Sequence, residues 1–353
     1  MLGDLHLAPP PSGPRPTGRR VAPASEITRA AGDSIPLPCP LFAYDLPWHL
    51  LTPTQGARLA HDLAEAQVFT SVLSQDIEGV PPTAHHMCPY RPERYGVTLD
   101  DLAAASIVDL RLTSEVGDGS VYTIEQLRRW DKRADSLPDS TVITGSRWPP
   151  DVAAPDRLRR KIDQLRVLAP QAAVFVAISP FHLQSDLANV LVAKPDGVIL
   201  RFDLDPTSLS TGYLIAMQTA ACRTMIDQSD AANTTMWVAA PTMTALDLVK
   251  LLALGAAAVS IDYLVLHHWH EVIDTHSSDQ HAAEYSFSQT AAATDETTVA
   301  RKNPIAPVVE DLLGEALTFV HGLGAAHYSQ LRREMLATVD ENLAAKTGAL
   351  LIR

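Results

Sequence analysis

The stretch from Met236 to Tyr263, MWVAAPTMTALDLVKLLALGAAAVSIDY, decides the fold of this chain. It contains two short apolar runs, Met236 to Ala240 and Ala258 to Ile261, on either side of an apolar helical pattern from Thr244 to Leu254. Gly255 follows this pattern at the position where a helix C-terminus favours a left-handed residue. A strand, a helix and a second strand in this order form a βαβ unit, which requires parallel strands.

The same alternation recurs along the chain. Eight short β-rich runs are predicted as strands: Pro40 to Tyr44, Val68 to Leu73, Ile107 to Leu112, Thr141 to Thr144, Ala173 to Ile178, Gly197 to Phe202, Met236 to Ala240 and Ala258 to Ile261. Helical patterns lie between most of them, at Thr54 to Ala66, Thr123 to Asp135, Pro155 to Leu168, Gln184 to Ala193, Gly212 to Gln228 and the helix above. Eight such units predict an α/β protein with a closed TIM (β/α)8 barrel, and a doubly wound open sheet is the alternative.

The chain divides into four predicted regions. Residues 1–38 are rich in Pro, Gly and Ser, and we expect an extended or disordered N-terminal tail or a wrap over the domain. Residues 39–275 are predicted to form the barrel, and residues 276–302 are predicted to form a polar, solvated loop. Residues 303–353 are predicted to form a C-terminal helical hairpin packed on the barrel.

Capping residues and apolar stripes define the two helices of that hairpin. Asn303 and Pro304 suit the start of the first helix, whose apolar stripe ends at Gly322. Ser329 is expected to cap the second helix, and Gly348 to end it. Its inward-facing residues are predicted to be Leu331, Met335, Leu336, Val339 and Leu343.

Composition excludes several classes of function. The formal charge of −13 argues against a nucleic-acid surface or an anionic membrane surface, because either needs clustered Lys and Arg. Cys39, Cys88 and Cys222 lie far apart without CxxC spacing, which excludes a sequence-local iron–sulfur or zinc–thiolate site and fits a reducing compartment. No apolar run reaches membrane-spanning length and no signal peptide is evident, so we expect a cytoplasmic protein.

Three segments resemble the FMN-binding, synthase-type barrel of the glutamate synthase family, including its shorter stand-alone relatives. PERYGVTLDDLAAASIVDLRL at Pro92 to Leu112 is similar to the family's GRFGVTPEYLNNADAIEIKI. LRREMLATVDENLAAKTG at Leu331 to Gly348 is similar to its LRREDLVALDRDLAELTG, and DLVKLLALGAAAVSI is the third segment. The resemblance covers Pro36 to Arg353 and rests on scaffold segments, so it implies fold and ancestry more than activity.

The resemblance implies a specific chemistry. In the family, reduced FMN converts an imine of 2-oxoglutarate to glutamate, a glutaminase domain supplies ammonia, and an iron–sulfur cluster delivers electrons. The cluster's cysteines, expected soon after strand eight, are replaced here by His267, His268, Trp269 and His270, so we expect no iron–sulfur cluster. No glutaminase domain or N-terminal nucleophilic cysteine is found in this sequence.

The phosphate-binding loops implied by the resemblance have changed. The family's Asp-Gly-Gly-Leu-Arg-Thr-Gly falls on residues 239–245, which keep Thr244 but lose the glycine pair, the last glycine and the arginine. The next turn, Gly-Phe-Gly-Thr, falls on residues 260–263, where Asp262 would place a carboxylate beside a phosphate dianion.

Other family positions are partly kept. Arg111 stands at a lysine position in the third predicted strand, and the following Gly-Gln-Gly becomes Thr113, Ser114 and Glu115. Glu78 remains from an acidic loop, while the lysine of strand five aligns with Ala177. The candidate cofactor-binding residues are therefore Glu78, Arg111, Ser114, Thr244 and Asp262.

Histidines form one new cluster near residues 267–281. If this segment is helical, His267, His270 and Glu271 share a face with spacing compatible with zinc or iron. The alternative is a polar loop with solvated histidines. His85 and His86, beside Cys88, are interpreted as a surface loop after strand two.

Charged residues at predicted strand ends form a second candidate site. Arg201, Asp203 and Asp205 follow the sixth predicted strand and Glu78 follows the second, so they could line one barrel mouth. The alternative is a set of ion pairs at loop bases. Arg111 could likewise bind an anion if it faces inward, or could form a structural salt bridge.

Three hypotheses for function follow. The first is a divergent barrel that has lost FMN and redox activity and acts as a binding or scaffold protein for a small molecule or a protein partner, with a homo-oligomer as one form of assembly. The second is an active FMN-dependent oxidoreductase with a divergent site. The third is a metal-dependent enzyme that uses the His267 to His281 cluster.

Overall fold

The computed structural model describes most of the 353-residue chain. The described residues are 2–8, 25–48, 51–77, 79, 81, 85–90, 97–112, 121–122, 136, 138, 143–144, 155–202, 212–241, 244–274 and 304–352. No helix among them is long and apolar enough to cross a membrane.

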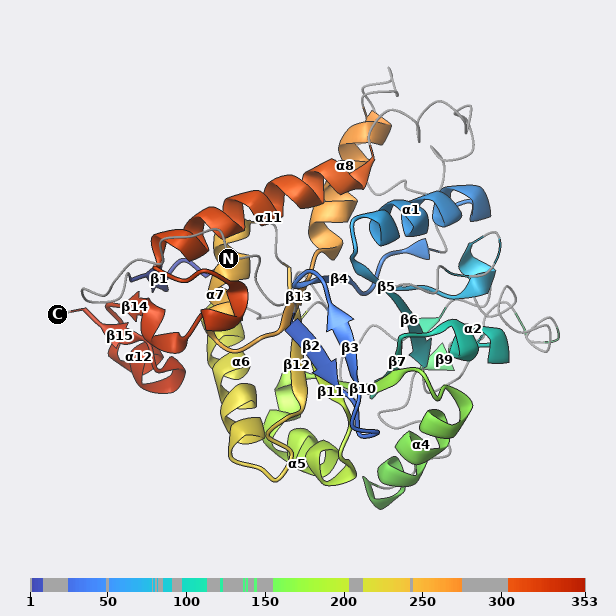
Figure 1. Cartoon of the computed structure of the whole chain (residues 1–353), viewed down its shortest axis with the longest axis horizontal. Helices are drawn as coiled ribbons and strands as arrows, with labels where there is room; N and C mark the ends of the chain where they lie inside the picture. Colours follow the sequence, from blue (N-terminus) through green and yellow to red (C-terminus); the bar gives the residue numbers. More distant parts are fainter. Residues whose placement is uncertain are drawn as a thin grey trace.

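Eight parallel strands close into a barrel, which confirms the predicted TIM (β/α)8 architecture (Figure 1). In chain order the strands are β4 (Leu41–Ala43), β5 (Phe69–Ser71), β6 (His86–Tyr90), β7 (Ile107–Arg111), β10 (Ala173–Ile178), β11 (Gly197–Arg201), β12 (Thr235–Ala239) and β13 (Ala258–Ser260). The last strand pairs with the first, with Val259 opposite Leu41. The open-sheet alternative is therefore wrong.

The third barrel strand was not recognised in the sequence. β6 pairs with β5 on one side and β7 on the other, so the prediction of a surface loop at His85 and His86 is wrong for this strand. His86 and Cys88 are buried. The sequence of this strand, HMCPY, does not indicate a central strand, because it contains His86 and because Pro89 is a residue type that is uncommon in central strands. The predicted strand at Thr141 to Thr144 lies outside the barrel, where its described part pairs with another short strand.

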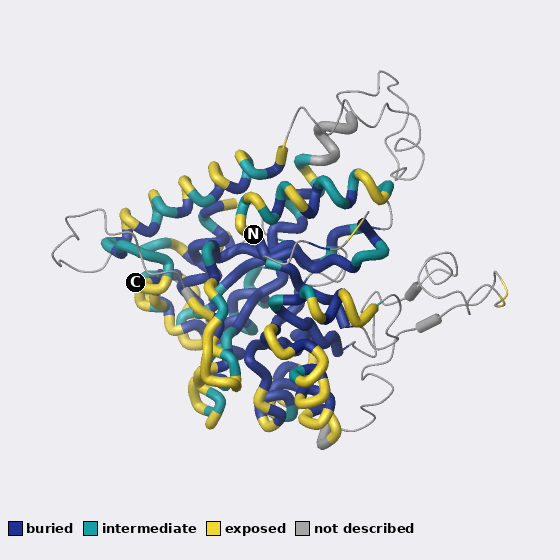
Figure 2. The backbone as a smooth tube through the Cα atoms, turned by 45° about the vertical axis from the view of Figure 1, so that its right-hand side comes forward, coloured by how far each residue is buried: buried dark blue, intermediate teal, exposed yellow. Residues whose placement is uncertain are grey.

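Helices cover the barrel, and several begin at capping residues visible in the sequence. They are α1 (Pro53–Glu65), α2 (Leu99–Ala104), α4 (Pro155–Leu168), α5 (Leu183–Ala193), α6 (Gly212–Asp227), α7 (Ala245–Ala253) and α8 (Asp262–Asp274). Thr52 and Gln55 form a capping box at the start of α1, and Thr98 and Asp101 form another at α2. Figure 2 shows buried strands inside these helices, whose outer faces are exposed. The predicted helix at Thr123 to Asp135 lies outside the described residues.

Aromatic rings fill the barrel interior. The indole of Trp237 lies with its centroid 4.7 Å from that of Phe42 and 4.9 Å from that of Phe175. Other interior residues include Phe69, Met87, Ile107, Ala177, Ile199 and Ala258. A packed interior leaves the chemistry of a TIM barrel to the ends of its strands and to the loops that follow them.

The described part of residues 1–38 wraps the domain instead of forming a free tail. Strands β2 (Ser25–Thr28) and β3 (Ser34–Leu37) form an antiparallel hairpin that places Ile27 and Leu37 in the cluster filling the barrel interior. The carboxylate of Asp196 accepts hydrogen bonds from the amides of Ala30 and Val174, at 2.7 Å each, and so ties the hairpin to the barrel.

The C-terminal region contains one long helix and a small sheet. α11 (Ile305–Gly322) packs against α7 and α1. It is followed by two 3-10 turns, strand β14 (Leu336–Thr338), helix α12 (Glu341–Thr347) and strand β15 (Leu350–Leu351). Strand β1 (His6–Leu7) pairs with β14, which completes a three-stranded sheet.

The second helix of the predicted hairpin is much shorter than expected, because only Glu341–Thr347 is α-helical and two 3-10 turns and a strand precede it. Leu336 belongs to a strand, Val339 is 70% exposed, and Asp340 rather than Ser329 caps α12. The apolar spacing fits a helix, but pairing of this segment with β1 and β15 decides its conformation. Gly348 does end α12, in the left-handed conformation with φ of 79°, as predicted.

Candidate functional site

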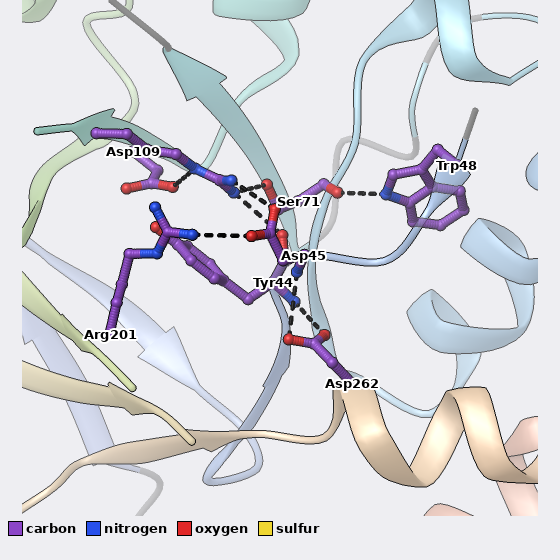
Figure 3. A network of polar contacts seen from close by, with 8 residues as sticks. Tyr44, Asp45, Trp48, Ser71, Asp109, Arg201 and Asp262 are labelled. Atoms are coloured by element: carbon purple, nitrogen blue, oxygen red, sulfur yellow. Dashed lines mark hydrogen bonds and ion pairs between the residues drawn. The ribbon is translucent and has the colours of Figure 1, made fainter. Parts of the chain in front are cut away.

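A cluster of charged and polar residues lies at the carboxyl ends of four barrel strands (Figure 3). Tyr44 and Asp45 follow β4, Ser71 ends β5, Arg111 ends β7 and Arg201 ends β11. We call these residues, together with Asp109, the mouth cluster. In TIM barrels this end of the strands carries the active site.

Arg111 is the centre of the mouth cluster. Its Nε donates to Asp109 Oδ2 and its Nη1 to Asp45 Oδ1, both at 2.7 Å. Its Nη2 donates to the carbonyl oxygen of Tyr44 at 3.0 Å and to Ser71 Oγ at 3.1 Å. The pKa of Arg111 is raised well above its ordinary value, because the nearby acidic groups outweigh burial, which alone would lower it. This guanidinium is charged and fixed.

Asp45 joins the two arginines. While its Oδ1 accepts from Arg111, its Oδ2 accepts from Arg201 Nη2 at 2.9 Å. The side chain of Asp45 is 33% exposed, whereas those of Arg111 and Arg201 are 4% and 6% exposed. The acid therefore lies on the solvent side of two buried cations.

The ring of Tyr44 lies against both cations. Its centroid is 4.1 Å from Cζ of Arg111 and 5.3 Å from Cζ of Arg201, distances typical of cation–π contacts. Burial raises the pKa of Tyr44 well above its ordinary value, so the phenol is neutral. Its buried hydroxyl has no hydrogen-bond partner among the described residues.

Asp262 holds the loop after β4 in place. Its Oδ1 accepts from the amide of Tyr44 at 2.6 Å, and its Oδ2 accepts from the amide of Asp45 at 3.2 Å. Asp262 is also the first residue of α8, where a negative charge interacts favourably with the helix dipole. The carboxylate is buried, and both its oxygens bind backbone amides of the β4 loop.

Two hydrogen bonds between Ser260 and Ala240 join the carboxyl ends of β12 and β13. Ser260 Oγ accepts from the amide of Ala240 and donates to its carbonyl oxygen, at 3.1 Å each. Thr244 caps α7 by accepting from the amide of Asp247 at 3.1 Å. These polar groups, at the loops expected to hold a phosphate, are engaged within the protein.

The predicted cofactor residues are brought together only in part. Arg111 and Asp262 both contact the pair Tyr44 and Asp45. Thr244 lies at the N-terminus of α7, while Glu78 and Ser114 lie outside the described residues. Arg201 joins the mouth cluster as considered from the sequence, and Asp203 and Asp205 lie outside the described residues.

The segment expected to hold a metal is helical at its start. α8 includes His267, His270 and Glu271, and this backbone places the three residues on one face, as the spacing predicts. The side chain of His267 is exposed, and those of His270 and Glu271 lie outside the described residues. Among the described side chains, no group of three potential ligands is close enough to hold a metal ion.

Tyr44, Asp45 and Ser71 were missed as site residues in the sequence. A single polar residue after a strand is common. Nothing in the sequence indicates that Asp45 contacts Arg201, because the two residues are 156 positions apart. The available signal was Asp45 itself, an acid directly after a predicted strand, at the end of the barrel where Arg111 and Arg201 were already expected.

Comparison with known proteins bears on the fold. No protein-family model matches the sequence, and no curated protein matches it in sequence either. An active chimera of (S)-mandelate dehydrogenase superposes with a TM-score of 0.55 at 14% identity, covering 95% of this chain and 88% of that one. Mandelate oxidase with benzoyl-formic acid gives 0.52 at 13% identity, covering 94% and 86%. Mandelate oxidase with (S)-2-phenylpropionate gives 0.52 at 14%, with the same coverage. These likenesses support the (β/α)8 barrel fold.

Proposed function

We propose that this chain is a ligand-binding TIM-barrel protein, of glutamate-synthase-like ancestry, in which FMN-dependent redox chemistry has been lost. The observation that carries the proposal is the buried carboxylate of Asp262 at the end of β13. In the family that the sequence resembles, this strand end binds the phosphate of FMN. A carboxylate and a phosphate dianion repel each other at such a distance unless a cation lies between them.

The surrounding residues also fit FMN poorly. The amide of Ala240, on the other phosphate-binding loop, is already bonded to Ser260. The strand-five position that carries a lysine in the family is Ala177, which is buried in the barrel interior. In flavin enzymes the cofactor supplies the redox chemistry. A barrel that cannot bind FMN therefore has no flavin-dependent activity, and binding of another ligand is the function that remains.

The mouth cluster supports a role in binding. Arg111 and Arg201 are buried cations at the end of the barrel where TIM-barrel ligands bind. Arginine side chains in such positions favour planar anions, because the guanidinium donates paired hydrogen bonds.

The visible absorbance spectrum of the purified protein tests the loss of FMN. We expect a protein without flavin bands and without flavin fluorescence after denaturation. Stoichiometric flavin released on denaturation would overturn the proposal.

The second candidate is an active FMN oxidoreductase. It is favoured by the likeness in fold to proteins that are by name an oxidase and a dehydrogenase of mandelate, a 2-hydroxy acid. The same spectrum distinguishes the two candidates. An active FMN oxidoreductase must contain bound flavin, and mandelate or another 2-hydroxy acid should reduce that flavin and bleach its visible absorbance.

The third candidate is a metal-dependent enzyme at α8, supported by the shared face of His267, His270 and Glu271. Elemental analysis tests it directly. Stoichiometric zinc or iron that is lost in a His267→Ala, His270→Ala double variant would support this candidate, whereas metal-free protein that takes up no added zinc or iron would remove it.

A further inference from the structure

The segment of residues 2–8 contacts two elements that lie far away in the sequence. Its strand β1 pairs with β14, and the backbone of Leu2 is bonded to α7. We propose that this segment is a releasable latch. When docked, it ties the first turn of α7 to the C-terminal sheet, and when released, it frees both elements while the barrel stays folded. The latch goes beyond the proposed function, because it operates whichever ligand the barrel binds.

Two charged side chains of α7 hold the backbone of Leu2. The amide of Leu2 donates to Asp247 Oδ1 at 2.9 Å, and its carbonyl oxygen accepts from Lys250 Nζ at 2.8 Å. Asp247 and Lys250 are each only 4% exposed, and charged residues are seldom buried so deeply unless they have partners. Because both contacts are made to the backbone of one residue, α7 recognises the peptide chain itself at this point.

Two leucines supply the apolar part of the docking. The side chains of Leu2 and Leu5 are buried and belong to the main hydrophobic core. A turn sets their spacing, because the amide of Leu5 donates to the carbonyl oxygen of Leu2 at 3.3 Å. Burial of apolar surface is the largest favourable term in docking of this kind, so the leucine pair is the part of the segment to which docking is most sensitive.

The rest of the segment adds an edge strand to the C-terminal sheet. His6 lies opposite Ala337, and the amide of Ala8 donates to the carbonyl oxygen of Met335 at 2.8 Å. The order of the sheet is β1, β14 and β15, and Figure 1 shows β1 beside β14. Loss of an edge strand frees backbone groups of its neighbour and leaves the other strand pair intact. The pairing of β14 with β15 therefore does not require β1.

These contacts make the segment a separable unit. The hydrogen bonds described above run to α7, β14 and Met335, which all lie outside the eight barrel strands. A short segment held by a few local contacts opens at a lower free energy than the whole domain unfolds. The barrel closes through pairing of β13 with β4, a contact that release of residues 2–8 leaves in place.

Asp247 connects the latch to the start of α7. While its Oδ1 accepts from Leu2, its Oδ2 accepts from Thr244 Oγ1 at 3.0 Å, and Thr244 is the residue that caps the helix. α7 follows β12, so its first turn lies near the carboxyl ends of the barrel strands. Release of the segment removes one of the contacts that hold this turn, which links the state of the latch to the barrel mouth.

Hydrogen–deuterium exchange of the full chain tests the latch. The double variant Leu2→Asp, Leu5→Asp should undock the segment, because carboxylates are costly to bury in an apolar site. We expect amides of β14 and of the first turn of α7 to exchange at least about ten-fold faster than in the wild type, while β7 and β10 keep their protection. Equal acceleration in the barrel strands, or none at β14, would overturn the proposal.

A control variant and a peptide sharpen this test. Leu99→Asp changes a leucine that is 71% exposed on α2, so it should leave exchange at β14 unchanged. A synthetic peptide of residues 1–8 should restore the protection of the double variant in a saturable manner. Ten-to-one docking at an effective concentration of about 1 mM corresponds to a dissociation constant of about 0.1 mM. No restoration at millimolar peptide, or equal restoration by a peptide with both leucines replaced by aspartate, would contradict the latch.

Exchange of the wild-type protein in urea keeps the test decisive if the double variant does not fold. Below the unfolding transition, amides of residues 5–8 and of β14 should exchange faster than those of the barrel strands. Their exchange should also depend less steeply on urea, because release of the segment exposes little surface. Exchange of both regions through global unfolding alone would rule out a separable latch.

Discussion

Gly197 lies directly under the ring of Phe175 on the neighbouring strand. A Cβ atom at position 197 would come 2.3 Å from Cζ of Phe175. The ring in turn packs edge-on against the indole of Trp237, so it has little room to move. The aromatic filling of the barrel therefore depends on the absence of a side chain at this position.

Gly197→Ala should destabilise the protein. Overpacking of a filled core costs about 1–3 kcal/mol, because rings and backbone must shift. Denaturant unfolding measures this loss. The matched control is Gly314→Ala in α11, where no atom lies within 4 Å of the added methyl group and alanine favours the helix by about 0.5–1 kcal/mol. A Gly197→Ala protein as stable as the wild type would contradict the packing described here.

Asp262→Asn should lower the free energy of unfolding by about 1–3 kcal/mol. The asparagine side chain has a single oxygen, so only one of the amides of Tyr44 and Asp45 keeps an acceptor, and that acceptor is no longer charged. The control is Asp227→Asn, whose side chain is 57% exposed and pairs with Arg223. Exposed pairs contribute about 0–1 kcal/mol, so this variant should change stability little. Equal effects in the two variants would show that Asp262 does not hold the loop after β4.

His86 should make stability depend on pH. Burial lowers the pKa of His86 in the folded protein, so the unfolded chain binds a proton more readily. The stabilising contribution is complete above the unfolded pKa of about 6.5 and is lost as pH falls from there toward the lower folded pKa. His86→Gln should remove this acid-dependent loss, as measured by unfolding at several pH values. His61→Gln, at an exposed position on α1, should leave it unchanged.

The three cysteines should not react in the folded protein. Burial raises the pKa of Cys39 and of Cys222 to about 12, and that of Cys88 further still. A thiol must ionise and be accessible to attack a disulfide reagent. We expect no rapid reaction with Ellman's reagent in buffer and three equivalents in denaturant. A rapidly reacting thiol in buffer would show that one of these sites is open.

Much of the fold could be predicted from the sequence because hydrophobic periodicity reports local structure. The run from Met236 to Tyr263 gave the correct order of β12, α7 and β13, and Gly255 does adopt a positive φ of 107°. Strand β6 was hidden because its proline and histidine do not resemble a central strand. The strand at Leu336 was hidden because its pairing partners, β1 and β15, lie elsewhere in the chain.

The site was less predictable because it depends on distant contacts. Arg111, Arg201 and Asp262 could be selected as charged residues at strand ends. Asp45 also follows a predicted strand, but its role becomes visible only when the closed barrel brings β4 near β7 and β11. Asp262 was expected to repel a phosphate. The structure adds that it holds the amides of Tyr44 and Asp45, which gives the carboxylate a structural role of its own.

Titration of the wild-type protein with FMN is the decisive test of whether this barrel has lost FMN binding. Quenching of flavin fluorescence, followed at fixed FMN while protein is added, reports binding at the barrel mouth. We expect no saturable change in flavin fluorescence beyond that given by an unrelated acidic protein. Saturable binding of one FMN per chain, weakened by substitution at the ends of β12 and β13, would contradict it.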